Sequence, residues 1–210
     1  MDLSVRFVVR DTAPVAATEP KPLRVDAARN QERILAAARE AFAEHGLDVG
    51  VQEIARRAGV GKGTLFRHFP SKDALILAIF EDFASAVEAA ADRALEEDDP
   101  WQGVRAFLED GGRMQAANMG YLDAMALQFG GEQMPANLCG RMDAAAVRVL
   151  EPARDAGLLR EGLTSRDLLV ALRMLGAGVC STRDDGSLAR YRDLLLAGMR
   201  ASDEPLPQMS

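Results

Sequence analysis

Residues 51–69, VQEIARRAGVGKGTLFRHF, combine basic side chains, three glycines and a hydroxyl group in one short stretch. The stretch carries four cations: Arg56, Arg57, Lys62 and Arg67. Glu53 is the one acidic residue among them. An arginine can donate two hydrogen bonds to the edge of a guanine, and a threonine offers bases a hydroxyl and a methyl group. These residue types therefore predict contact with double-stranded DNA.

Two short helices joined by a glycine turn are predicted to position these side chains. The apolar face of the first helix consists of Val51, Ile54, Ala55 and Ala58. Gly59 follows at the point where many helices end in a left-handed residue. The second helix is expected to start near Lys62 and to end before Pro70. Two short helices with this tight turn predict a helix-turn-helix.

The second short helix has an inward and an outward face when its residues are projected at about 100° each. Leu65 and Phe69 point inward. The opposite face and its flanks carry Gly63, Thr64, Phe66, Arg67 and His68. Without a side chain, Gly63 would let the start of the helix approach a phosphate closely. Gln52 and Lys72 are predicted to contact the DNA backbone, which fixes register. The residues predicted to distinguish bases are Thr64, Arg67 and His68.

Positive charge is concentrated at the N-terminal end of a chain that is acidic overall. The 210 residues have a formal net charge of -7. Residues 1–72 contain 12 Lys and Arg against 9 Asp and Glu, whereas residues 73–210 contain 13 against 23. We therefore expect the N-terminal end alone to meet DNA, with an acidic remainder that resists non-specific DNA binding.

The pattern along the chain predicts an all-α fold, because no alternating strand pattern occurs. Residues 1–25 are expected to be a disordered tail, 26–72 a helix-turn-helix DNA-binding domain and 73–210 a larger helical domain. Besides the two short helices, helices are predicted at about 29–45, 72–97, 101–117, 120–130, 136–156, 165–180 and 187–200. Glycine pairs and prolines are interpreted as breaks between them.

Residues 51–75, VQEIARRAGVGKGTLFRHFPSKDAL, resemble the signature of the TetR family of bacterial transcriptional regulators. The preceding AFAEHG matches the end of the family's first helix. The resemblance is specific over residues 29–83, and beyond them it is a matter of helix count, length and order. It implies a groove-facing set of Lys62, Gly63, Thr64, Arg67 and His68, and backbone contacts from Gln52, Phe66 and Lys72.

Two positions depart from the family's pattern. The family usually has a tyrosine where this chain has Phe66, and a phenylalanine cannot donate a hydroxyl to phosphate. Phe66 is therefore assigned to packing rather than to a polar contact. Gly50 stands where a capping Ser or Thr is common, which weakens the start of the first short helix by a few tenths of a kcal/mol.

The resemblance implies that the chain from about residue 80 onward binds a small molecule and forms a dimer. Large, pliable side chains of the middle helices are candidates for binding this effector: Trp101, Phe107, Met114, Met119, Tyr121, Met125, Phe129 and Met142. Plain core packing is the alternative for each of them.

A homodimer through the last two helices, around SRDLLVALRMLGAGVCS and SLARYRDLLLAGMR, is implied in the same way. Gly176, Ala177 and Gly178 would permit close helix approach, and packing within one chain would also explain the amphipathic pattern. A dimer would bind a palindromic operator with half-sites in adjacent major grooves.

The leading hypothesis is a cytoplasmic repressor, without cofactor or metal, that an effector releases from its operator. The alternatives are control by a partner protein, no ligand at all, or activation. An enzyme is not expected, because His45 and His68 are the only histidines and no nucleophile, phosphate-loop or metal motif occurs. Cys139 and Cys180 are expected to be buried and inert, with thiol sensing as the alternative. No apolar run is long enough to span a membrane.

Overall fold

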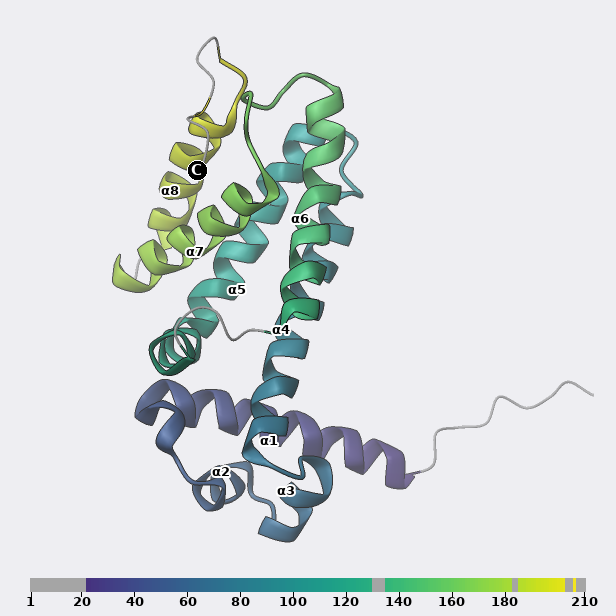
Figure 1. Ribbon diagram of the computed structural model, residues 1–210, viewed down its shortest axis with the longest axis vertical. Helices are drawn as coiled ribbons and strands as arrows, with labels where there is room; N and C mark the ends of the chain where they lie inside the picture. Colours follow the sequence, from purple (N-terminus) through teal and green to yellow (C-terminus); the bar gives the residue numbers. More distant parts are fainter. Residues whose placement is uncertain (1–21, 130–134, 183–184, 203–205, 207–210) are drawn as a thin grey trace, which may run out of the picture.

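The computed structural model describes residues 22–129, 135–182, 185–202 and 206 (Figure 1). The elements in chain order are α1 (Pro22–His45), the 3-10 turn η1 (Gly46–Asp48), α2 (Val51–Ala58), α3 (Lys62–His68), α4 (Lys72–Ala94), α5 (Pro100–Phe129), α6 (Ala136–Asp155), α7 (Ser165–Thr182) and α8 (Asp185–Met199). Within the described residues, extended pairing is limited to one isolated bridge between Leu159 and Arg200. The all-α prediction is confirmed.

A first hydrophobic core joins α1, η1, α2 and α3 to the first half of α4. Its fully buried large side chains include Ile34, Phe42, Ile54, Leu65, Leu75 and Ile79. Each such side chain contributes about 1.5–3 kcal/mol of transfer free energy when it is removed from water. Leu138, from the start of α6, is also buried in this core. The helix-turn-helix is therefore packed on a support that includes α4 and the start of α6.

A second core lies among the other half of α4 and α5, α6, α7 and α8. In Figure 1, α4 runs from the lower group of helices, α1 to α3, into the upper group. Phe80 on α4 belongs to the first core, whereas Phe83, three residues later, belongs to the second. The C-terminal part of the chain also reaches the lower group directly, because α5 packs against α1 and η1. The two cores are therefore linked by one continuous helix and by a helix contact.

Helix α5 is continuous through positions at which the sequence predicts a break. The separate helices predicted at 101–117 and 120–130 are wrong, because α5 spans Pro100–Phe129. Its glycine pair serves packing: a Cβ added at Gly111 would lie 2.5 Å from Leu172 Cδ2, and one at Gly112 would lie 2.5 Å from Leu175 Cδ2. The pair therefore lets α7 approach α5 closely, and the packing offsets the low helix propensity of glycine.

Helix α1 begins at Pro22, earlier than the predicted start near Arg29 and inside the segment expected to be a tail. A proline suits the first position of a helix, because the N–H it lacks would have no partner there. Residues 1–21 lie outside the described part of the chain. The remaining predicted helices agree with α4, α6, α7 and α8 to within three residues at each end.

Ion pairs between helices hold the C-terminal part together. Arg141 on α6 donates two hydrogen bonds to the Glu88 carboxylate on α4, at 2.8 and 2.5 Å. These hydrogen bonds lower the pKa of Glu88. Arg192 on α8 is buried and donates to Glu109 on α5 at 2.5 Å. Across the described residues, no helix is both long enough and apolar enough to cross a membrane.

Candidate nucleic-acid interface

The turn between α2 and α3 depends on Gly59. Its φ of 61° and ψ of 36° place it in the left-handed region, which glycine adopts without strain. The Gly59 N–H donates to the Arg56 carbonyl at 3.1 Å, and the Val60 N–H donates to the Ala55 carbonyl at 3.0 Å. This pair of hydrogen bonds is a Schellman motif, which satisfies the last carbonyls of α2 and directs the chain into α3.

The flanks of the helix-turn-helix are capped differently. Gly50 precedes α2 and provides no side-chain cap, as its residue type predicts. Ser71 caps α4, because its Oγ accepts a hydrogen bond from the Ala74 N–H at 3.0 Å. Helix α3 starts after Gly61, whose carbonyl accepts from the N–H of Leu65 at 3.0 Å. The position of α3 is therefore determined by the turn before it and by the capped helix after it.

Helix α3 has the inward and outward faces that its sequence predicts. Leu65 is fully buried, and Phe69, directly after the helix, is also buried. The outward side consists of exposed Lys62, Gly63, Phe66 and Arg67 and half-buried Thr64 and His68. A Cβ added at Gly63 would have no heavy atom within 4 Å, so the first turn of the helix presents open backbone. We call this outward side the α3 face.

Two of the cations in the motif are paired with acidic side chains. Arg56 donates to both carboxylate oxygens of Glu53, at 2.8 and 2.7 Å. Arg57 donates to Glu53 at 2.8 Å and forms a 2.7 Å ion pair with Glu44 on α1. Hydrogen bonds from Arg56 and Arg57 lower the pKa of Glu53 to about 2. Arg57 thus ties α2 to α1, which the local sequence does not reveal because Glu44 lies on another helix.

Lys72 also has a partner inside the protein. Its half-buried ammonium group donates to the carbonyl of Leu47 in η1. Sequence reasoning also missed Arg33 on α1, which donates to the Gly59 carbonyl at 3.3 Å and so holds the turn. The DNA-backbone contact predicted for Lys72 stays a prediction, and it would compete with the bond to Leu47.

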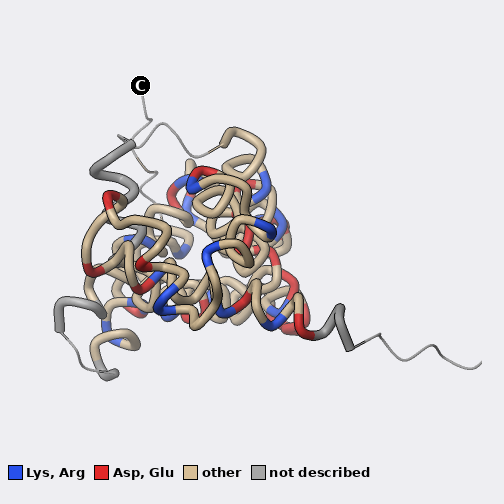
Figure 2. Tube along the Cα trace, turned by 90° about the horizontal axis from the view of Figure 1, so that it is seen from below, with Lys and Arg blue, Asp and Glu red and all other residues tan. Residues whose placement is uncertain are grey.

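The cations of the α3 face are differently placed. Lys62 lies 5.7 Å from the centroid of the Phe66 ring, within cation–π range. Arg67 is exposed, and no hydrogen bond or ion pair to its guanidinium group is found in the described part of the chain. Gln52 is exposed on the first turn of α2. Figure 2, seen from the helix-turn-helix end, shows blue and red segments interspersed, so pairing rather than total charge distinguishes the α3 face.

The interpretation of Phe66 as a packing residue is wrong. Its side chain is 37% exposed, and it belongs to neither hydrophobic core. The reason is its position, one residue after buried Leu65, which turns it by about 100° away from the core.

The residues predicted to bind an effector lie in different packing environments. Phe107 is fully buried in the second core, with Trp101 and Met114 packed against that core. Met142 packs against both cores, and Met119 is buried. Tyr121, Met125 and Phe129 belong to α5, but the structure does not describe their side chains. The Trp101 ring also carries Arg200 at 4.5 Å from its centroid. Effector binding by these residues stays a prediction.

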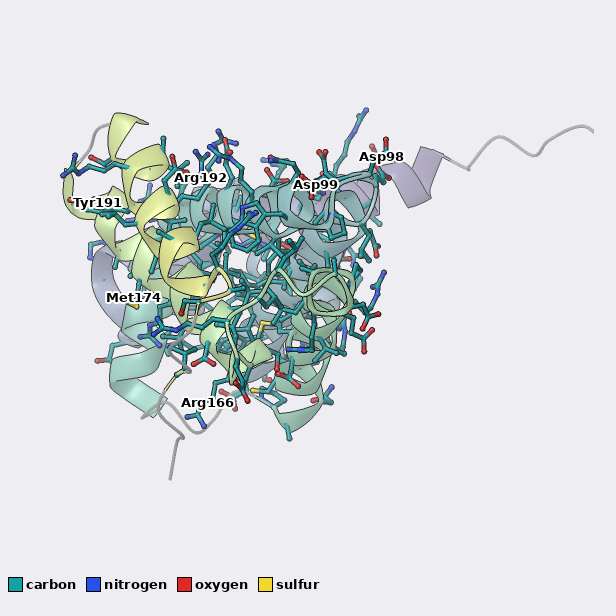
Figure 3. The ribbon with its side chains drawn as sticks, turned by 90° about the horizontal axis from the view of Figure 1, so that it is seen from above. Asp98, Asp99, Arg166, Met174, Tyr191 and Arg192 are labelled. Atoms are coloured by element: carbon teal, nitrogen blue, oxygen red, sulfur yellow. The ribbon has the colours of Figure 1, made fainter. Side chains whose placement is uncertain are left out.

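The glycines of α7 bring helices of the same chain together. A Cβ at Gly176 would lie 2.4 Å from Gln115 Cβ on α5, and one at Gly178 would lie 3.2 Å from the Tyr191 ring on α8. The same helices expose the large apolar side chains of Val170 and Met174 on α7 and of Leu194 on α8, which we call the α7–α8 face. Figure 3 shows Met174 and Tyr191 on the same outer side of the molecule.

Two further expectations concern metal ions and the two cysteines. They contain no group of three or more His, Cys, Asp or Glu side chains that could hold a metal ion. The expectation of a buried thiol is wrong for Cys139, which is exposed next to buried Leu138 on α6. The side chain of Cys180 lies outside the described residues.

Known proteins share both the motif and the fold. The family model for bacterial regulatory proteins, tetR family, matches residues 34–79. The HTH-type transcriptional regulatory protein RaaS of Mycobacterium tuberculosis is 32% identical over 148 residues, which are 70% of this chain and 67% of RaaS. The regulator EthR of the same species is 23% identical over 135 residues, which span 62% of EthR.

Solved structures cover more of the chain. The TetR transcriptional regulator SCO0520 from Streptomyces coelicolor is 30% identical with a TM-score of 0.61, over 81% of this chain and 98% of that one. A TetR transcription regulatory protein from Mycobacterium vanbaalenii is 32% identical with a TM-score of 0.61, over 85% and 99%. The motif, the helix order and these similarities agree: the chain belongs to the TetR family of bacterial regulatory proteins and is a transcriptional regulator.

Proposed function

We propose that this regulator is a repressor that binds a palindromic operator as a homodimer and is released by a small-molecule effector. The observation that carries the proposal is the α3 face. On this face Arg67 is exposed, whereas Arg56 and Arg57 on the neighbouring helix α2 form ion pairs with carboxylates. A guanidinium group that has no partner among the described residues is available for a guanine edge or a phosphate.

The proposed contacts follow from the positions of the side chains. Lys62 and the open backbone at Gly63 meet phosphate at the start of α3, while Arg67 and half-buried Thr64 and His68 face the bases. Gln52, exposed at the start of α2, contacts the flanking backbone. One seven-residue helix covers few base pairs, so specificity requires a second copy of the motif.

The α7–α8 face supplies the proposed dimer contact. Met174 and Leu194 are 59% and 60% exposed, which is unusual in a chain whose other large apolar side chains lie mostly in the two cores. Val170 lies four residues before Met174 and exposed Ala177 three residues after it, so α7 presents an apolar stripe at helical spacing. A two-fold contact would bury the same stripe on both copies.

Effector control is proposed to act through α4. Phe83 and Val87 on α4 lie in the second core with Phe107, so a ligand that displaces those side chains would move the helix. The same helix places Leu75 and Ile79 against the helix-turn-helix. A change in its tilt would alter the spacing of two α3 helices, and a coupling of about 2.7 kcal/mol lowers operator affinity about a hundredfold.

The proposal is tested by selecting duplexes from random DNA with the full chain. We expect enrichment of an inverted repeat whose two half-sites lie on one face of the duplex, about one helical turn apart. Two chains should bind each selected duplex, as measured by sedimentation. Compounds that release the duplex would then identify the effector class. Enrichment of no sequence, or of a single unrepeated half-site bound by one chain, would contradict the proposal.

A further inference from the structure

Phe66 is a large apolar side chain in the middle of the α3 face. Its 37% exposure contrasts with the burial of Leu65, the residue before it, and of Phe69, three residues after it. The free fold gains little from a phenyl ring in this position, because the transfer free energy of an aromatic side chain is realised when it leaves water. Single exposed apolar residues are common, so the argument depends on the surroundings of this one.

The surroundings of Phe66 are those of a surface that meets a polyanion. Lys62 lies one turn earlier, with its ammonium group 5.7 Å from the ring centroid, and exposed Arg67 is the next residue. A Cβ added at Gly63, three residues earlier on the same helix, would have no heavy atom within 4 Å. Two cations, which attract phosphates, therefore lie close to Phe66 on the same helix.

The chemistry of the ring restricts what it can recognise there. Phenylalanine has no donor or acceptor, so it cannot hydrogen-bond to a phosphate or to a base edge. The apolar group that a major groove presents is the 5-methyl group of thymine, and phenylalanine is one of the side chains that contacts it.

We infer that the Phe66 ring packs against one thymine methyl group in each operator half-site and so selects thymine there. The inference rests on the proposed function, because it requires α3 to lie in the major groove. It makes Phe66 a specificity-determining residue whose contribution is apolar, in contrast to the polar contacts of Arg67.

The experiment removes the methyl group rather than the base. A duplex selected by the full chain is made with deoxyuridine in place of each thymine in turn, symmetrically in both half-sites. Affinity is measured by fluorescence anisotropy at about 150 mM salt, where non-specific binding is weak. At one symmetric position, removal of the two methyl groups should lower the affinity of the unchanged protein about fifteenfold, or about fourfold per methyl group.

The variants assign that cost to the ring. For Phe66→Ala the same replacement should lower the affinity less than about twofold. For Phe66→Leu the loss of affinity should lie between those of Phe66→Ala and the unchanged protein. Leu77→Ala removes an apolar side chain of similar exposure from α4. This variant should show the same loss of affinity on deoxyuridine duplexes as the unchanged protein. Circular dichroism checks that each variant is folded.

The possible results separate this inference from the proposed function. If the protein selects a sequence that Arg67→Ala no longer prefers, the regulator proposal stands. The inference is then overturned by a consensus without thymine, by deoxyuridine having no effect, or by an equal effect in Phe66→Ala. If the unchanged protein prefers no sequence, both are overturned.

Discussion

The α3 face and the α7–α8 face expose different chemistry on the same chain. On α3 the exposed groups are Lys62, Phe66 and Arg67 beside an open glycine. Among the described side chains of α7 and α8, the exposed large apolar ones are Val170, Met174 and Leu194. The first surface suits a polyanion with apolar groups in its groove, and the second suits an apolar surface such as its own copy.

The exposure of side chains and their internal partners therefore indicate a binding surface better than the number of charged residues does. Arg56, Arg57 and Lys72 carry the same positive charge as Arg67, but each is bound to an acceptor that holds the helix-turn-helix together. Charge-dependent binding through the α3 face should weaken steeply with salt, whereas apolar association through α7 and α8 should not.

Met174→Glu should have the largest effect. A two-fold contact would bury the new carboxylate on both copies without a partner, which weakens the dimer about a thousandfold or more. Sedimentation equilibrium should show a monomer at concentrations where the unchanged chain is a dimer, and operator affinity should fall with it.

Leu77→Glu is the matched control for Met174→Glu. Leu77 is 40% exposed on α4, away from α7 and α8, so its substitution should leave the dimer intact. A dimer that persists in Met174→Glu, or that is lost equally in both variants, would contradict the assignment of the α7–α8 face.

Gly63→Ala should change the free energy of unfolding and the affinity for DNA in opposite directions. A Cβ at Gly63 meets nothing within 4 Å, so the substitution should raise the free energy of unfolding by about 0.5–1 kcal/mol through helix propensity. Against a duplex the added methyl group should clash and lower affinity about tenfold or more. Gly140→Ala, on α6 and equally open, should leave DNA binding unchanged. Equal affinities of both variants would show that α3 does not approach DNA closely.

Local signals predicted the helix-turn-helix well. Gly59 after an amphipathic octamer indicated the turn, because this signal acts within a few residues. The same reasoning failed in α5, where it predicted a break between residues 117 and 120. It also could not show why Gly111 and Gly112 must be small, because the residues that approach them lie on α7.

The site was predicted in part for the same reason. Helical projection identified which residues of α3 point outward, since that depends on spacing alone. It could not show that Lys72 bonds to the Leu47 carbonyl or that Arg57 pairs with Glu44, because those partners come from other elements. The assignment of Phe66 to packing rested instead on its lack of a hydroxyl group, which does not show whether neighbouring side chains bury the ring.

Lys62→Met and Lys72→Met form a pair that separates a DNA contact from a structural one. Lys62→Met should reduce the slope of log affinity against log salt by about 2 for a dimer and leave the free energy of unfolding unchanged. Lys72→Met should lower that free energy by about 1 kcal/mol, because the Leu47 carbonyl loses its donor. Salt titrations and urea unfolding measure the two quantities. A changed salt slope in Lys72→Met would return that residue to the DNA contacts.

Glu53→Gln should have the smallest effect, and that effect should depend on pH. Arg56 and Arg57 lower the pKa of Glu53 to about 2, below the ~4.3 of an unfolded glutamate. As the pH falls, the unfolded chain therefore binds the proton first, so the stabilisation by Glu53 is complete above about pH 4.3 and is lost toward about pH 2. Urea unfolding should show the unchanged chain more stable than the variant near neutral pH, with a difference that narrows in acid. A difference independent of pH would contradict the pairing.

The most direct test of the account compares two arginines of the same motif on a selected palindrome and on a scrambled duplex. At about 150 mM salt the unchanged protein should prefer the palindrome by about a hundredfold or more. Arg56→Ala, which removes a cation bound to Glu53, should keep that preference, whereas Arg67→Ala should lose it. An Arg67→Ala variant that still prefers the palindrome by a hundredfold would contradict the claim that the α3 face determines specificity.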